Sequence, residues 1–195
     1  MKRLSRNEFK TTYGDIFTKI FEPKSSKEDP WPLLFRDENW MAVAVVSLHG
    51  LEEPEYGAVV RAAKQMGDKE VVITDAEAEP RHQQAVVFRW PASAGIWDMY
   101  SEGPFGVDAA LFGASGSWGI YFCWEPRIAY VGGTPEFMGL FLDAIGGVEG
   151  AKRGLRYMVE ETEAPEELRI MAVMLNHLGW AEELMGDKYP GSPGS

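Results

Sequence analysis

The stretch WGIYFCWEPRIAYVGG, residues 118–133, constrains the fold more than any other part of this chain. Successive side chains of a strand point to opposite faces, so the stretch divides into two sets of residues. One set is Trp118, Ile120, Phe122 and Trp124, and the other is Gly119, Tyr121 and Cys123. The tripeptide at 125–127 reverses the chain, and residues 128–133 return beside the first strand. We therefore predict an antiparallel hairpin that anchors the core, and a role of its outer face in recognition stays open as an additional option.

Helix signals lie on both sides of this hairpin. Thr134 is a good N-cap and Pro135 suits the first helical position, so a helix should follow and end at Gly146. A capping box at Ser5 and Glu8 begins an N-terminal helix, which apolar residues at helical spacing extend to Ile20. The sequence predicts further helices at residues 54–66, 148–162 and 165–178, and a short one at 107–113.

Three further segments have the composition of strands. Residues 40–48, WMAVAVVSL, are apolar on both faces and rich in valine, which favours a strand in the middle of a sheet. Residues 70–75 and 84–90 are two more strands, separated by a charged loop. The strand at 40–48, the helix at 54–66 and the strand at 70–75 form a plausible β-α-β unit.

These elements predict an α+β fold with a mixed or mainly antiparallel sheet, an N-terminal helix, a β-α-β start, a C-terminal hairpin and terminal helices. We divide the chain into four parts. They are an N-terminal helix and linker (1–29), an α+β core (30–146), a C-terminal helical pair (147–186) and a flexible tail (187–195).

Charge restricts the partners of the chain. Nineteen Lys and Arg residues against thirty Asp and Glu give a formal net charge of −11. Such a surface repels phosphate groups, which disfavours direct binding to nucleic acids or anionic membranes and permits a basic protein partner. Cys123 is the only cysteine, which fits a reducing cytoplasm, and no segment has the length of a membrane-spanning helix.

Catalytic signatures are missing from the sequence. It contains neither a dinucleotide or phosphate-binding glycine motif nor a zinc-protease or calcium-loop pattern, and we predict no catalytic residue, metal or cofactor. Ser115 and Ser117 suit a turn, and Cys123 suits the apolar interior of a strand. One alternative remains open: His49 and Glu52 follow the strand at 40–48 and could line a pocket in a small-molecule enzyme or ligand-binding domain.

Residues 115–145 resemble the hairpin-helix unit of SUKH-type bacterial immunity proteins. The similar elements are an aromatic strand, a short turn, a return strand and a capped helix that opens with Thr134, Pro135, Glu136 and Phe137. The resemblance implies a non-enzymatic protein that neutralises a toxin by binding it.

Together, the charge and the resemblance favour an acidic cytoplasmic binding protein that occludes a basic toxin or other basic partner. A structural or assembly protein is a further option, to be separated by its oligomeric state. The predicted contact residues are the acidic side chains Glu52, Glu53, Glu55, Glu77 and Glu79, together with whichever of the hairpin residues Tyr121, Trp124 and Tyr130 is exposed.

Overall fold

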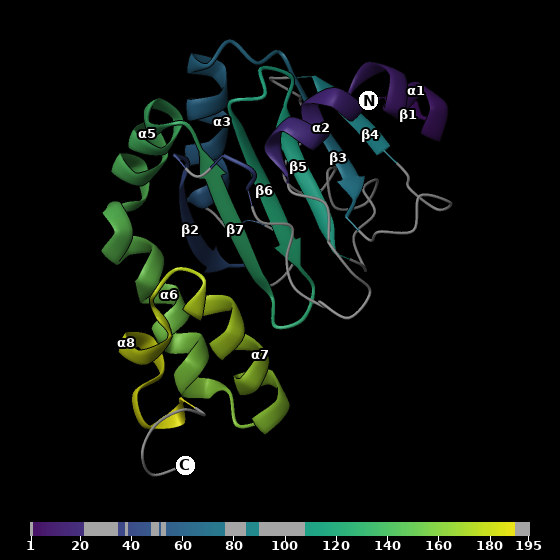
Figure 1. The fold of residues 1–195 in the computed structure, drawn as a ribbon. Helices are drawn as coiled ribbons and strands as arrows, with labels where there is room; N and C mark the ends of the chain where they lie inside the picture. Colours follow the sequence, from purple (N-terminus) through teal and green to yellow (C-terminus); the bar gives the residue numbers. More distant parts are fainter. Residues whose placement is uncertain are drawn as a thin grey trace.

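The fold is an α+β arrangement around one seven-stranded sheet (Figure 1). This computed structural model describes residues 2–21, 35–37, 39–47, 51, 54–76, 85–89 and 108–189, with 85–89 as backbone only. The strands, in their order across the sheet, are β1 (Lys2–Leu4), β4 (Ala85–Arg89), β3 (Glu70–Asp75), β5 (Ala109–Gly113), β6 (Trp118–Cys123), β7 (Ile128–Gly133) and β2 (Met41–Val46). Each pair of neighbours is antiparallel, which confirms the predicted fold class.

The predicted hairpin is formed by β6 and β7, with Cys123 opposite Ile128 at its closed end. Its side chains alternate as expected: Trp118, Ile120 and Phe122 face one way, while Tyr121 and Cys123 belong to the core on the other side of the sheet. Trp124 lies beyond the strand, in the turn. Every residue of β6 and β7 is buried, so the option of an outer face that is free for recognition does not hold for the strands themselves.

β5 corrects the prediction of a short helix at residues 107–113. Ala109–Gly113 is a strand between β3 and β6, and all five residues are buried. The apolar run is bounded by the turn at 114–117, which is too soon for a stable helix. Pairing on both sides therefore decides the structure, and local helix propensity is overridden.

β2 lies at an edge of the sheet, not in the middle as its composition suggested. It is apolar on both faces because helices cover both of them. Val43 and Val45 pack in the core cluster on one face, and Ala44 packs in the cluster on the other. The β2-α3-β3 segment exists, but β7, β6 and β5 separate its two strands, so α3 (Glu55–Gln65) is part of a long crossover.

Helices cover the sheet on both faces. α3 and α5 (Pro135–Ile145) pack against each other and fill the core with Trp118 and Phe122. α5 begins at the predicted N-cap Thr134 and ends at Gly146, whose φ of 87° is left-handed. The helix α6 (Gly147–Glu161) then packs on β2 and contributes Ala151 to one core cluster and Leu155 to the other. α6 thus shields the edge of the sheet from pairing with another strand.

The C-terminal segment lies at the lower left of Figure 1, below the sheet in this view. It consists of α7 (Pro165–Asn176), a short α8 (Ala181–Met185) that the sequence did not predict, and a 3-10 turn, η1 (Gly186–Lys188). Residues 187–189 belong to this ordered segment and not to a tail. The ammonium group of Lys188 donates to the carbonyl oxygens of Val159, Glu160 and Thr162, at 2.9, 2.8 and 3.0 Å, and so satisfies the end of α6.

The N-terminal helix begins at the predicted capping box, with both of its hydrogen bonds present. It is divided into α1 (Arg6–Thr12) and α2 (Gly14–Ile20), because the chain turns at Tyr13, whose hydroxyl donates to Glu70 at 3.1 Å. Gly119 and Gly132 are paired on the sheet beneath this region. A Cβ atom would lie 2.7 Å from the Phe21 ring at the first glycine and 2.3 Å from the Phe35 ring at the second. The two glycines therefore make room for these aromatic rings.

Candidate functional site

One end of the sheet gathers the residues that the sequence singled out. β2, β3 and β6 end there, and β5 and β7 begin there. We call this end of the strands, which is distinct from the edge strands β1 and β2, the hairpin edge. It is defined by Ser47, Ala76, Asp108, Trp124 and Arg127. Backbone hydrogen bonds link neighbouring members: Ser47 N–H donates to the Arg127 carbonyl, and Ala76 N–H donates to the Asp108 carbonyl, both at 2.8 Å.

The predicted acidic residues are related to this edge through the strands that precede them. Glu52, Glu53, Glu77 and Glu79 lie outside the described residues, as does His49 of the alternative pocket. β2 precedes the first acidic segment and β3 the second, and both strands run towards the hairpin edge. Glu55 is described: it lies half-buried in the first turn of α3.

Of the three predicted aromatic contacts, only Trp124 is exposed, with 46% of its surface accessible. Tyr121 and Tyr130 are buried, at 1% and 3%, so the prediction, which was made for whichever of the three is exposed, applies to Trp124 alone. Both hydroxyls are used inside the protein. Tyr121 donates to Asp108 Oδ2 at 2.5 Å, and Tyr130 donates to the Met174 carbonyl of α7 at 2.6 Å.

Both tyrosines are held in the neutral form by their surroundings. Burial, together with the adjacent Asp108 carboxylate, raises the pKa of Tyr121 above its usual range. Burial is also the main cause of the raised pKa of Tyr130. Cys123, which lies between the two tyrosines in the sequence, is also buried. Its Sγ lies 2.8 Å from the Glu125 carbonyl oxygen. Tyr121, Tyr130 and Cys123 are therefore structural residues of the core.

Asp108 connects the buried tyrosine with the exposed turn. Its second carboxylate oxygen accepts the backbone N–H of Trp124 at 3.0 Å. The turn Trp124–Arg127 is therefore held at its first residue by the side chain of Asp108, which precedes β5, and at its last residue by the backbone of Ser47, which follows β2. The sequence analysis did not identify Asp108. A lone carboxylate immediately before a buried apolar run was the available signal.

No family model, curated protein or solved structure matches this chain.

A pocket of about 750 Å³ lies at the opposite end of the sheet from the hairpin edge. Asp68 and Ser115 line it together with Met66, Glu70 and their neighbours in the chain. The Asp68 carboxylate accepts the backbone N–H of Ser115 at 2.7 Å, its hydroxyl at 2.9 Å and the Trp118 indole N–H at 2.7 Å. Asp68 thus fastens the turn between β5 and β6 to the end of α3, which is a structural role.

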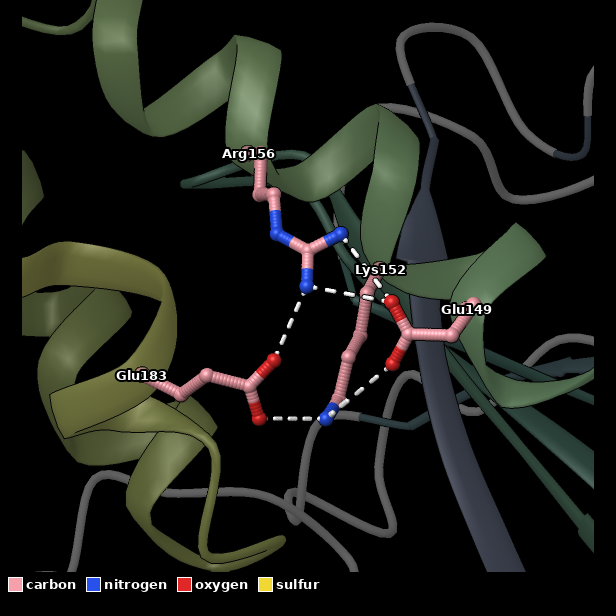
Figure 2. A network of polar contacts seen from close by, with 4 residues as sticks. All are labelled: Glu149, Lys152, Arg156 and Glu183. Carbon is pink, nitrogen blue, oxygen red and sulfur yellow. Dashed lines mark hydrogen bonds and ion pairs between the residues drawn. The ribbon is translucent and has the colours of Figure 1, made fainter.

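A charge network joins α8 to α6 on the surface of the C-terminal segment (Figure 2). Lys152 contacts Glu183 at 2.5 Å and Glu149 at 3.7 Å, and Arg156 contacts the same two carboxylates at 2.9 and 3.1 Å. Lys152 also lies 5.1 Å from the centre of the Trp180 ring. Hydrogen bonds from Lys152 and Arg156 lower the pKa of Glu183. Two cations and two carboxylates cancel here, so the network adds nothing to the acidic field.

The acidic segment at 160–167 is exposed between α6 and α7. Glu166 pairs with Arg169 at 2.7 Å, and it lies with Glu167 in the first turn of α7, where the helix dipole favours carboxylates. Among the residues that the structure describes, no group of three or more histidine, cysteine or acidic side chains could hold a metal ion. None of the described helices is long and apolar enough to cross a membrane.

Proposed function

We propose that this chain is a non-enzymatic cytoplasmic binding protein that neutralises a basic protein partner by occluding its surface. The resemblance to SUKH-type proteins makes a bacterial immunity or inhibitor protein the specific form of this proposal, with a basic toxin as the target. The observation that carries it is the direction of β2 and β3: both end at the edge that presents the exposed Trp124, and an acidic segment follows each of them.

The net charge of the chain also supports the binding of a basic protein. A net charge of −11 attracts a cationic protein over a distance of about 10 Å at ordinary salt and raises its association rate. Once the partner has arrived, the exposed side chain of Trp124 supplies apolar contact area. Charge thus brings the partner close, and Trp124 contributes to the stability of the complex.

The proposal is tested by charge reversal at the hairpin edge. The immobilised protein is incubated with lysate of its native host at low and moderate salt, and the retained proteins are quantified by mass spectrometry. We expect a stoichiometric basic protein that leaves the column as the salt concentration rises. Changing Glu52, Glu53, Glu77 and Glu79 together to Lys should abolish its retention, because the segments that follow β2 and β3 in the chain then carry positive charge and repel a basic protein.

A matched control carries the same change in net charge elsewhere. Glu161, Glu163, Glu167 and Glu182 are exposed on the C-terminal helices and the connection between α6 and α7. Changing all four to Lys should leave most of the retention intact. Equal losses in the two variants would show that net charge alone attracts the protein, and an unchanged complex with the first variant would refute the proposed edge.

A further inference from the structure

Arg127 has a left-handed backbone conformation, which is unfavourable for a residue other than glycine. Its φ is 68°, and it is the one non-glycine residue with a positive φ in the described part of the chain. This left-handed region is unfavourable for side chains with a Cβ atom, and glycine is the usual residue there. Glycine would also preserve the backbone hydrogen bond that the carbonyl of this residue accepts from Ser47.

The side chain of Arg127 gives no compensating contact within the protein. It is exposed, and it makes no hydrogen bond or ion pair with another residue that the structure describes. Residues held in unfavourable backbone conformations cluster at sites that bind or act on other molecules. The guanidinium group is therefore a candidate for contact outside the chain.

Trp124 occupies the other end of the same turn and is exposed as well. Its backbone is fixed by Asp108, which also accepts the Tyr121 hydroxyl, so the turn is built on buried residues of the sheet. Tryptophan and arginine are the residue types most enriched at the energetic centres of protein interfaces, and a fixed backbone reduces the entropy lost on binding.

We propose that the turn Trp124–Arg127 is the anchor of the partner contact. Trp124 fills an apolar pocket of a folded protein, and Arg127 pairs with a carboxylate beside that pocket. The partner is net basic, in keeping with the net charge of −11, and the pairing of one cation of this chain with one carboxylate of the partner fixes the orientation of the two proteins. This inference rests on the proposed function, and it adds Arg127, a residue that neither the charge pattern nor the resemblance identified.

The test compares stability with retention in the lysate experiment. Arg127→Gly should raise the melting temperature by about 1–3 °C, because it removes the strain at φ 68°. The same variant should retain about tenfold less of the salt-sensitive basic protein. Trp124→Ala should reduce retention at least as much, while Arg127→Lys should retain more than Arg127→Gly because it keeps the charge. Arg153→Ala, at an exposed position of α6, is the control and should behave as the wild type.

Each other outcome has a distinct meaning. If Arg127→Gly lowers the melting temperature, the fold does need this side chain and the inference is overturned. Undiminished retention by Arg127→Gly and Trp124→Ala also overturns it, but leaves the acidic binding protein standing. Retention that is lost when the lysate is treated with nuclease would point to a nucleic-acid partner, and this inference would be wrong. If no basic protein is retained by the wild type, the proposed function and the inference fail together.

Discussion

Replacing Asp68 with Asn should strongly destabilise the protein, although the two side chains have nearly the same size. Asp68 is 5% exposed, and its carboxylate accepts three hydrogen bonds from Ser115 and Trp118. An amide offers a single acceptor oxygen, so its NH2 group must face at least one of these donors. At least one hydrogen bond is then lost, and the others lose the strengthening effect of the negative charge.

The size of the effect follows from these contacts. Hydrogen bonds to charged groups contribute about 1.5–3 kcal/mol each, and a buried donor left without an acceptor costs about 1–3 kcal/mol. We expect Asp68→Asn to lower the free energy of unfolding by about 2–4 kcal/mol, since one bond is lost and two are weakened. For a chain of this length, that corresponds to a fall in melting temperature of roughly 4–16 °C.

Urea and thermal unfolding, followed by far-ultraviolet circular dichroism, measure this change directly. Glu163→Gln is the control, because it makes the same chemical change at an exposed position. A second measurement is the difference in tryptophan fluorescence between the variant and the wild type, since the indole N–H of Trp118, one of seven tryptophans, loses its charged partner. If Asp68→Asn unfolds within about 0.5 kcal/mol of the control, the view that this carboxylate fastens the β5–β6 turn to α3 is refuted.

Three further predictions concern other parts of the fold. Gly132→Ala should cost about 1–3 kcal/mol of stability in urea unfolding, since its Cβ would lie 2.3 Å from the Phe35 ring, whereas Gly139→Ala, with no atom within 4 Å, should not destabilise. Lys188→Met should cost about 1 kcal/mol and increase hydrogen exchange at the end of α6, because three carbonyl oxygens lose their charged donor; unchanged exchange would contradict this. Glu183 has a lowered pKa in the folded protein, so it stabilises the fold above the unfolded value of about 4.3 and this contribution is lost as the pH falls. The stability difference between the wild type and Glu183→Gln should therefore be present at pH 7 and disappear in acid. A difference that grows as the pH falls would contradict this prediction.

The sequence was most informative where local signals and tertiary structure agree. The β6–β7 hairpin alternates between two well-packed faces, and the caps at Ser5 and Thr134 satisfy backbone groups within their own helices. Such features depend on residues a few positions apart, and short-range patterns therefore predict them correctly.

The errors occurred where a distant partner determines the structure. The apolar run Ala109–Gly113 is short enough to read as a helix, and only its pairing with β3 and β6 makes it a strand. β2 reads as a central strand because both faces are apolar, but α6 supplies the burial that a neighbouring strand would otherwise give. A single sequence does not contain the position of a helix more than 100 residues further along the chain.

The candidate site shows the same division. The sequence analysis predicted a contact for whichever of Tyr121, Trp124 and Tyr130 is exposed. It could not select among them, because the sequence does not reveal what covers the second face of the hairpin. Arg127 could not be found from the sequence at all. Its significance comes from a φ angle, and an arginine between proline and isoleucine carries no local signal of a left-handed backbone.

The two ends of the sheet can be separated by experiment, because their polar groups are used differently. At the end with Asp68, the carboxylate is fully engaged by donors from the same chain, so a substitution there changes stability. At the hairpin edge, the Trp124 and Arg127 side chains are exposed, and the fold would tolerate or prefer glycine at the latter. Substitutions at the two ends should therefore give opposite results. Asp68→Asn should lower the melting temperature but leave partner retention unchanged below that temperature, while Arg127→Gly should reduce retention without any loss of stability. If both variants instead lose stability and retention together, the hairpin edge is an ordinary part of the core's support and not a surface that serves a partner.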